Sequence, residues 1–241
     1  MANLDTLAPD ARPDGAQANV ILRAENLRKK YRTGEEDLEV LRGVSIELRE
    51  GETVAITGAS GVGKSTLLHI LGALDRPTEG SLHIRGVDVL DLDDDERAEF
   101  RSAHVGFVFQ FHNLLPEFTA LENVMMPALI ARHADGMEAR ARGLLEQVDL
   151  AQRLDHRPGE LSGGECQRVA VARALVMKPE LVLADEPSGN LDDVASRRLH
   201  DLMRELARVE NQAFLVMTHD RDLAASLDRT GHIDGGILEL C

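Results

Sequence analysis

The sequence contains no hydrophobic run that approaches the roughly 18 residues needed to cross a membrane. Its first residues, MANLDTLAPDARPDGAQAN, also lack the apolar centre of a secretory signal. We therefore expect a soluble chain in the cytoplasm, one that reaches a membrane only through a partner.

Cysteine and positive charge are also scarce. The two cysteines, Cys166 and Cys241, have neither the spacing of metal ligands nor that of a disulfide framework, which fits a reducing compartment. We expect Cys166 to be a small packing residue inside a helix. Only 27 Lys and Arg residues oppose 42 Asp and Glu residues, and the net charge is −15. Because nonspecific binding to nucleic acid depends on clustered positive charge, we expect no nucleic-acid partner.

The chain is long enough to bury one substantial core. It has 241 residues, of which 43% are hydrophobic. Residues 1–19 are rich in Ala, Asp and Pro and show no periodicity, so we predict a disordered leader there. We predict a single domain for residues 20–241.

The hydrophobic pattern predicts an α/β fold. Short alternating runs between Val20 and Leu48 favour antiparallel strands. Four apolar runs are typical of buried parallel strands: residues 53–57, 105–109, 181–185 and 213–217. Helical patterns separate them, as in βαβ units. We therefore expect a mainly parallel core sheet with an antiparallel β subdomain, built from residues 20–110 and 179–241, and an inserted helical subdomain at residues 111–178.

A glycine-rich loop follows the first of these parallel strands. The stretch GASGVGKST matches the P-loop pattern G-x4-G-K-S, which ends on Lys64 and Ser65. In such a loop the backbone amides surround a β-phosphate, the lysine neutralises the β- and γ-phosphate oxygens, and the serine hydroxyl binds Mg²⁺. A chance match in a chain of this length has a probability of roughly one in a hundred. We expect the whole loop to bind nucleotide: Gly58, Ala59, Ser60, Gly61, Val62, Gly63, Lys64, Ser65 and Thr66.

Polar side chains follow three other predicted strands. Asp185 ends the run LVLAD and is expected to hold a metal ion, while the adjacent Glu186 could orient a water in line with the γ-phosphate. His219 and Gln110 should reach the same carboxyl edge of the sheet, where His219 would contact the γ-phosphate or water and Gln110 would bind Mg²⁺ or water. For two of these residues a purely structural role is the alternative. Glu186 could be a helix N-terminal acid or a loop ion-pair partner, and His219 could be structural.

A second anion-binding pattern occurs about a hundred residues later. In LSGGECQR, residues 161–168, a hydroxyl and two glycines precede a helical run, so backbone N–H groups at the helix start would point at negative charge. One nucleotide cannot occupy both glycine-rich helix starts of one chain if helical residues separate them. Two chains arranged head to tail remove the difficulty.

These motifs resemble those of ABC-transporter ATPase subunits over residues 20–240. The resemblance implies an ABC-type P-loop ATPase that dimerises around two ATP molecules, so that each P-loop faces the LSGG residues Ser162, Gly163 and Gly164 of a second copy. It also implies that adenine stacks on Tyr31, although this tyrosine could be an ordinary half-buried aromatic. The loop at residues 188–192 would cross the interface and place Asp192 at the nucleotide.

The same resemblance implies a division of chemical roles. Glu186, His219 and Gln110 would be the catalytic residues. Ser65, Gln110 and Asp185 would bind Mg²⁺. The sequence departs from the family at Glu165, where glutamine is usual. Because a carboxylate at a γ-phosphate would be repulsive, we expect Glu165 to point away, toward Arg168 or its own helix start.

Within the family, the stretch FQFHNLLPEFTALENVMMP at residues 109–127 looks like that of ATPases serving lipoprotein-releasing exporters. ATPases of macrolide-type exporters or of a related cell-division complex are the alternative. Such a subunit would sit peripherally on the cytoplasmic face of the inner membrane. The element His112–Pro116 lies where membrane subunits dock in the family, and an apolar socket would be formed by Phe111, Leu114, Leu115 and Phe118, unless packing within the helical subdomain explains these residues.

Two rival functions belong to other classes. Soluble ABC ATPases that act on DNA or the ribosome insert long coiled-coil arms or join two cassettes, and neither fits in 241 residues with a charge of −15. A nucleotide sensor without hydrolysis is disfavoured by the complete set of catalytic residues.

Overall fold

A computed structural model describes residues 20–33, 36–133 and 135–240. The predicted leader at residues 1–19 and Cys241 lie outside the described residues. The helices are α1 (Lys64–Leu71), α2 (Asp94–His104), α3 (Ala120–Ile130), α4 (Met137–Gln147), α5 (Gly163–Leu175), α6 (Asp193–Glu210) and α7 (Arg221–Ser226), with a 3₁₀ turn at Pro158–Glu160. In the described part of the chain, no helix is both long and apolar enough to span a bilayer.

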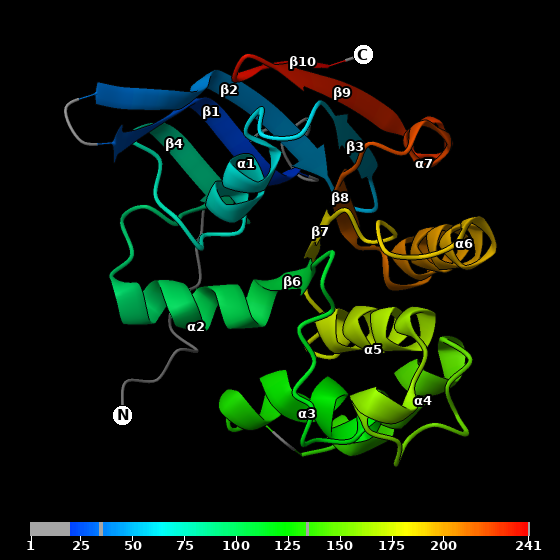
Figure 1. Cartoon of the computed structure of the whole chain (residues 1–241). Helices are drawn as coiled ribbons and strands as arrows, with labels where there is room; N and C mark the ends of the chain where they lie inside the picture. Colours follow the sequence, from blue (N-terminus) through cyan, green and yellow to red (C-terminus); the bar gives the residue numbers. More distant parts are fainter. Residues whose placement is uncertain (1–19, 34–35, 134, 241) are drawn as a thin grey trace.

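The strands form two sheets (Figure 1). One consists of β1 (Val20–Thr33), β2 (Glu36–Arg49), β4 (Glu79–Ile84) and β5 (Val87–Asp88); it is antiparallel, in the order β2-β1-β4-β5. The other consists of β3 (Thr53–Thr57), β6 (Val105–Val108), β7 (Leu181–Asp185), β8 (Ala213–Met217), β9 (Arg229–Asp234) and β10 (Ile237–Leu240). Its order is β10-β9-β3-β8-β7-β6, and every pair except β9–β10 is parallel. The predicted fold class is confirmed.

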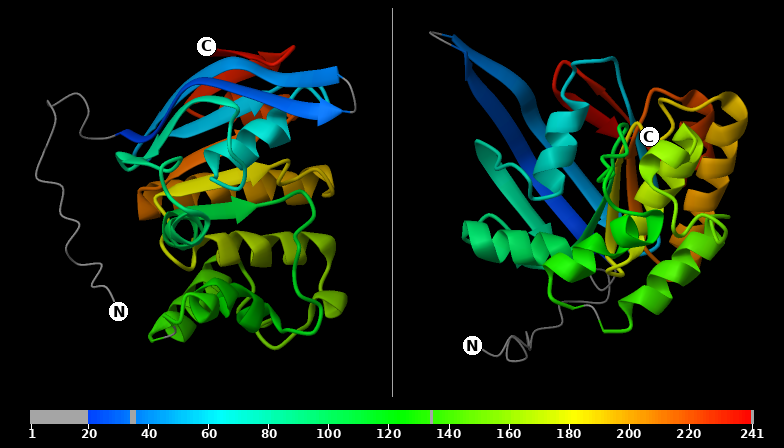
Figure 2. Two further views of the ribbon diagram at one scale, coloured as in Figure 1. Left: turned by 90° about the vertical axis from the view of Figure 1, so that its left-hand side faces the viewer. Right: turned by 60° about the horizontal axis from the view of Figure 1, so that its bottom comes forward.

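Two hydrophobic cores lie on opposite faces of the parallel sheet. Helix α1 lies between this sheet and the antiparallel one, and α3, α4 and α5 lie on the other face (Figures 1 and 2). Alternate residues of each strand serve the two cores: Leu183 and Leu215 pack with α1, whereas Val182 and Phe214 pack with α5 and α6. Burial on both faces explains the continuous apolar runs of the central strands.

Glycine allows one of these helices to approach the sheet closely. A Cβ on Gly106 of β6 would lie 2.4 Å from the carbonyl oxygen of Ala174 in α5, closer than real side chains come. Cys166 is buried within α5, as expected for a packing residue. The C-terminal end of α5 is therefore packed tightly against β6.

The strands that precede the predicted site residues end level with one another. In the parallel register, Met217 of β8 pairs with Ile56 of β3 on one side and with Asp185 of β7 on the other. Loops that follow the carboxyl ends of parallel strands therefore share one edge of the sheet, where ligands of open α/β folds bind.

Candidate functional site

The P-loop connects β3 to α1. Its last glycine, Gly63, has φ +110 and caps α1, and this left-handed backbone favours glycine. A Cβ there would also lie 3.1 Å from the Val40 carbonyl oxygen. The side chain of Lys64 turns back over the loop, and its Nζ donates to the carbonyl oxygens of Gly58 at 2.7 Å and Ala59 at 3.1 Å. The loop thus encloses the ammonium group that is predicted to meet phosphate.

A cavity of about 510 Å³ opens beside this loop. It brings together the four polar residues predicted from the strand ends. Its lining consists of Val40, Ser60, Gly61, Gly63, Lys64, Ser65, Thr66, Gln110, Asp185, Glu186 and His219. The other predicted site residues do not line it: Tyr31, Gly58, Ala59, Val62, Ser162, Gly163, Gly164 and Asp192.

Two oxygen donors at the cavity lie side by side. The Ser65 hydroxyl donates to Asp185 Oδ2 over 2.8 Å, which joins the start of α1 to the end of β7. A hydroxyl and a carboxylate are oxygen ligands of the kind that Mg²⁺ prefers. The described residues contain no group of three or more His, Cys, Asp or Glu placed to hold a metal. A Mg²⁺ ion here would therefore take most of its ligands from phosphate and water.

Glu186 lies between a lysine and a histidine. Its Oε1 is 3.7 Å from Lys64 Nζ, and its Oε2 accepts bonds from the backbone N–H of His219 at 3.2 Å and from His219 Nδ1 at 2.8 Å. The backbone of Glu186 has φ +46, a conformation uncommon outside glycine, and its N–H donates to the Met217 carbonyl oxygen at 2.8 Å. Backbone strain of this kind often occurs at functional sites.

The bond to Glu186 fixes the orientation of the His219 ring. A carboxylate only accepts hydrogen bonds, so the proton in this contact must be on Nδ1 of His219. In the neutral ring, Nε2 is then an acceptor, and in the protonated ring it is a donor. The imidazole is exposed at the mouth of the cavity, so a phosphate oxygen or a water can reach Nε2.

The loop that follows Glu186 contacts Gln110. Asn190 Nδ2 donates to the Gln110 carbonyl oxygen at 3.0 Å. The loop is anchored by a buried bond of 2.8 Å between Ser188 Oγ and His200 Nε2 on α6. Asp192 ends the loop and caps α6, because its Oδ1 accepts from the N–H groups of Val194 and Ala195 at 2.9 Å each.

The second anion-binding pattern, at residues 161–168, forms a capped helix start, which we call the second cradle. Ser162 is the N-cap of α5 and accepts from the N–H of Glu165 at 3.3 Å, while Glu165 Oε2 accepts from both the N–H and the hydroxyl of Ser162 at 2.8 Å. Glu165 therefore bonds to its own helix start, which is one of the two directions expected for it. Its ion pair is not with Arg168, however. Arg153 Nε donates to Glu165 Oε1 at 3.0 Å, because the turn after α4 brings this arginine to the helix start.

These contacts also fix the charge of Glu165. The bonds from the backbone and side chain of Ser162, together with Arg153, lower the pKa of Glu165 from 4.5 to about 2. Its carboxylate is ionised at every physiological pH.

Tyr31 lies on β1 and is partly exposed. Its hydroxyl donates to Asp75 Oδ2 at 3.1 Å, and Lys29 Nζ lies 4.9 Å from the centre of its ring. One ring face is thus taken by a cation. Adenine stacking on Tyr31 stays a prediction.

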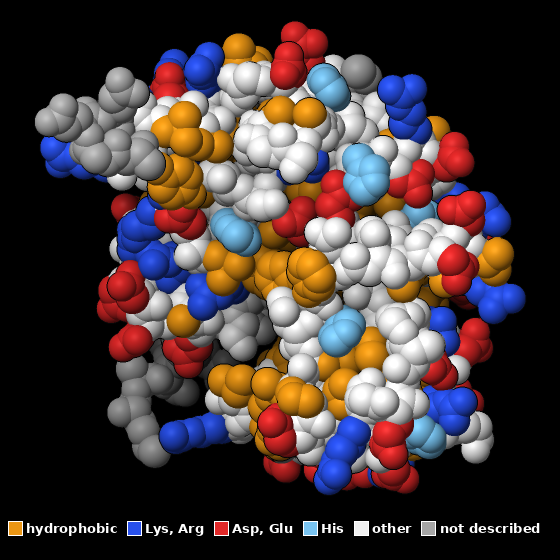
Figure 3. All heavy atoms as spheres, viewed as in Figure 1, with side chains coloured by type: hydrophobic (Ala, Val, Ile, Leu, Met, Phe, Trp, Pro, Cys, Tyr) orange, Lys and Arg blue, Asp and Glu red, His pale blue; other side chains and the backbone are white. Residues whose placement is uncertain are grey.

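The predicted apolar socket is only partly exposed. Phe111 is 70% exposed, and Leu115 and Phe118 are also exposed, but Leu114 is 8% exposed and packs in the core with α3 and α5. The expectation that Leu114 lines a docking surface is therefore wrong. Figure 3 shows hydrophobic side chains on this face of the molecule, around α3 and the segment that precedes it.

The structure reveals supporting residues that the sequence analysis missed. Gln167 of α5 donates to the Phe109 carbonyl oxygen at 2.9 Å. Arg173 of the same helix donates to the carbonyl oxygens of His112 and Asn113 at 2.7 Å each. Helix α5 therefore holds the backbone on both sides of Gln110. The sequence carries no signal for these bonds, because they join residues about 60 positions apart in the chain.

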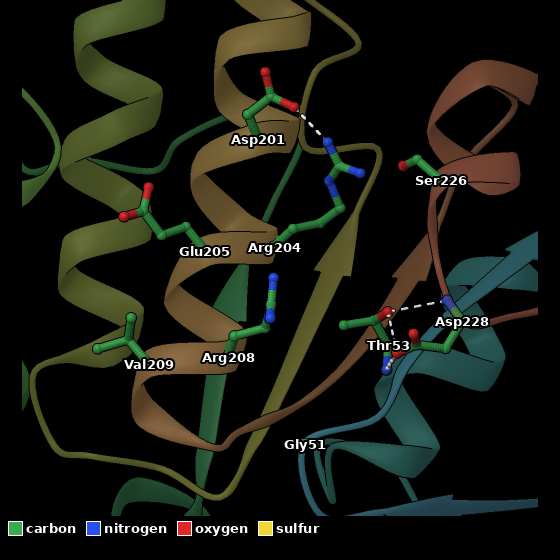
Figure 4. A pocket seen from close by; sticks show the side chains of 9 residues that line it. All are labelled: Gly51, Thr53, Asp201, Arg204, Glu205, Arg208, Val209, Ser226 and Asp228. Atoms are coloured by element: carbon green, nitrogen blue, oxygen red, sulfur yellow. Dashed lines mark hydrogen bonds and ion pairs between the residues drawn. The ribbon is translucent and has the colours of Figure 1, made fainter.

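A larger cavity, of about 1030 Å³, lies at the opposite edge of the sheet, at the start of β3 (Figure 4). Its charges are of both signs. Arg204 pairs with Asp201, and the Thr53 hydroxyl and N–H donate to Asp228. It contains none of the predicted site residues.

Comparison with known proteins agrees with the fold. A family profile described as ABC transporter matches residues 41–189. Two solved structures of the ATP-binding cassette MJ0796 are similar, one of them described as a dimeric post-hydrolysis state bound to ADP and Pi and the other as a dimeric bacterial ABC transporter cassette. Each has a TM-score of 0.84 and 39% identity, and the match covers 90% of this chain and 96% of the other. The chain belongs to the ABC transporter family, as a nucleotide-binding, ATP-hydrolysing subunit.

The chain is also similar to individual proteins within this family. The lipoprotein-releasing system ATP-binding protein LolD of Geobacter metallireducens is 53% identical over 221 residues, which cover 90% of this chain and 98% of the relative. LolD of Pseudomonas syringae pv. tomato is 52% identical over 219 residues, with 90% and 96% coverage. LolD of Porphyromonas gingivalis is 51% identical over 220 residues, with 91% and 99% coverage.

Proposed function

We propose that the chain is the ATP-driven motor of an exporter that releases lipoproteins from the inner membrane toward the outer membrane. The proposal is supported by the LolD relatives, which the chain matches over nearly their whole length. Residues 20–241 would form a single ATPase domain with a helical subdomain at residues 111–178.

The observation that carries the ATPase mechanism is the Lys64–Glu186–His219 cluster beside the P-loop. Lys64 would exchange its bonds to the P-loop carbonyl groups for bonds to the β- and γ-phosphates. Ser65, Asp185 and Gln110 would hold Mg²⁺, which when bound neutralises phosphate charge. Glu186 would then orient the attacking water, and His219 would contact the γ-phosphate through Nε2.

Two chains would share each nucleotide. The N–H groups of Gly163 and Gly164 have no acceptor among the residues that the structure describes, so they are free to bind a phosphate presented by a second copy. Ser162 and Asp192 would complete that contact, and Tyr31 would stack on the adenine. Hydrolysis would remove the γ-phosphate that both chains bind, and the interface would open.

Membrane subunits would receive this motion. The exposed side chains Phe111, Leu115 and Phe118 lie on the segment that follows Gln110, so a partner bound there would sense the nucleotide site directly. The chain would thus be peripheral, on the cytoplasmic face of the inner membrane, and the membrane subunits would contact the lipoprotein.

The proposal is tested by purifying the chain from detergent-solubilised membranes and reconstituting the complex with a lipoprotein in vesicles. ATP should release the lipoprotein to a soluble carrier, and the Glu186→Gln complex should release none. A complex that hydrolyses ATP but releases no lipoprotein would contradict the proposed cargo. Phe111→Asp should abolish co-purification with the membrane subunits, and Leu129→Asp, at an exposed hydrophobic residue near the end of helix α3, is its control.

A further inference from the structure

The second cradle contains an unusual charge for a site that meets phosphate. The Glu165 carboxylate accepts two bonds from Ser162, at the helix start where the N–H groups of Gly163 and Gly164 are free. An ionised carboxylate next to a bound triphosphate costs electrostatic energy unless a cation compensates for it. Arg153 is the cation that the structure places there, 3.0 Å from Glu165 Oε1.

The turn that carries Arg153 is fixed on both sides. The N–H of Arg153 donates to the Leu150 carbonyl oxygen at 2.9 Å, and its own carbonyl oxygen accepts from the N–H of His156 at 3.0 Å. The turn is also bonded to the start of α3, because Ala120 N–H donates to the His156 carbonyl oxygen at 2.8 Å. The guanidinium is therefore presented from a fixed backbone rather than from a free surface loop.

The two halves of the Glu165 carboxylate have separate partners. Oε1 faces Arg153, and Oε2 accepts from Ser162. The Ser162 hydroxyl has one proton, which must leave Glu165 if it is to bind a phosphate oxygen. The backbone N–H of Ser162 stays bonded to Oε2 during that exchange, so the serine keeps its position while its hydroxyl turns.

We propose that Arg153 is a positioning and charge-compensating residue of the second cradle: it holds Glu165 against Ser162 and cancels the carboxylate charge where the ATP of the partner copy docks. This inference rests on the proposed ATP-bound dimer. It assigns to Arg153 a role in dimerisation and not in the binding of ATP by a single chain, because the P-loop cavity of the same chain is lined by other residues.

The test measures dimerisation of the Glu186→Gln protein with ATP by sedimentation, and separately the ATP affinity of the monomer at low protein concentration. Each ATP site of the Arg153→Ala protein loses one half-exposed ion pair, which should raise the dissociation constant of the dimer about threefold. A dimer has two such sites, so its dissociation constant should rise roughly tenfold. The ATP affinity of the monomer should not change. The defect should shrink as salt concentration rises, because screening weakens the exposed carboxylate's repulsion of ATP.

A second substitution separates charge from packing. Glu165→Gln keeps an oxygen acceptor for Ser162 but removes the charge, so adding it to Arg153→Ala should restore most of the lost dimerisation. Arg142→Ala is the matched control, because Arg142 forms an exposed ion pair with Glu138 in the preceding helix and should change nothing. An Arg153→Ala protein that dimerises like its parent, or that Glu165→Gln does not rescue, overturns the assignment. A parent that fails to dimerise with ATP overturns both this assignment and the ATP-bound dimer.

Discussion

Removing the imidazole of His200 should destabilise the loop that joins Glu186 to Asp192. His200 Nε2 and Ser188 Oγ are 2.8 Å apart, and both residues are buried. His200→Ala leaves the Ser188 hydroxyl buried without this partner, which costs about 1–3 kcal/mol. A loss of about 2 kcal/mol lowers Tm by about 4–8 °C in a protein of this size.

The effect should depend on pH in a defined direction. Burial lowers the pKa of His200 below its ordinary value of 6.5, with Arg204 acting in the same sense and Asp220 and Asp201 opposing. As the pH falls through about 6.5, the unfolded chain gains a proton that the folded chain resists, so the folded state loses stability. The Tm difference between the natural protein and His200→Ala should therefore be largest near pH 8 and shrink near pH 5.5.

Thermal unfolding at both pH values measures this effect, with His133→Ala as the control because His133 is exposed. Ser188→Ala should lose less stability when His200 is already alanine, because the two residues share one bond. A Tm difference that grows toward acidic pH would refute the assignment of His200 as a neutral partner of Ser188.

Three further substitutions test the site and its support. Lys64→Ala should weaken ATP binding about tenfold or more in a nucleotide titration, as expected for loss of charge-assisted bonds to phosphate. Unchanged affinity would exclude a phosphate contact. Gly106→Ala should cost about 1–3 kcal/mol in thermal or denaturant unfolding, because the new Cβ meets a backbone oxygen of α5; full stability would contradict the close packing of β6 on α5. Asp192→Ala should cost about 1 kcal/mol through loss of the α6 cap, and no change in unfolding would show that water replaces the two bonds.

The sequence predicts the strands that are buried on both faces. Among the more exposed strands it predicts the antiparallel pair between Val20 and Leu48 but misses others. Strands β3, β7 and β8 are continuous apolar runs, and their predicted limits match the structure. Strand β6 ends one residue before the predicted limit. Strands β4 and β9 have only alternate buried residues among polar ones, and short strands of this kind give little periodic signal.

The candidate site divides in the same way. Lys64, Asp185 and Glu186 are recognisable because the P-loop and the strand ends have a fixed spacing along the chain. The partner of Glu165 cannot be recognised from the sequence, because Arg153 and Arg168 are both near it along the chain. Only the turn after α4 decides which arginine reaches the carboxylate. The burial of Leu114 likewise depends on how α3 and α5 pack, and no local pattern separates it from its exposed neighbour Leu115.

In the proposed ATP-bound dimer, the ATP shared between Lys64 of one copy and Ser162 of the other is the contact on which hydrolysis and motion would both depend. Sedimentation of the Glu186→Gln protein with Mg²⁺ and either ATP or ADP tests it most directly. We expect a dimer with ATP, a monomer with ADP, and a monomer with ATP when Ser162 is replaced by arginine (Ser162→Arg). A Glu186→Gln protein that stays monomeric with saturating ATP at every concentration, alone and with its membrane subunits, would contradict the shared site.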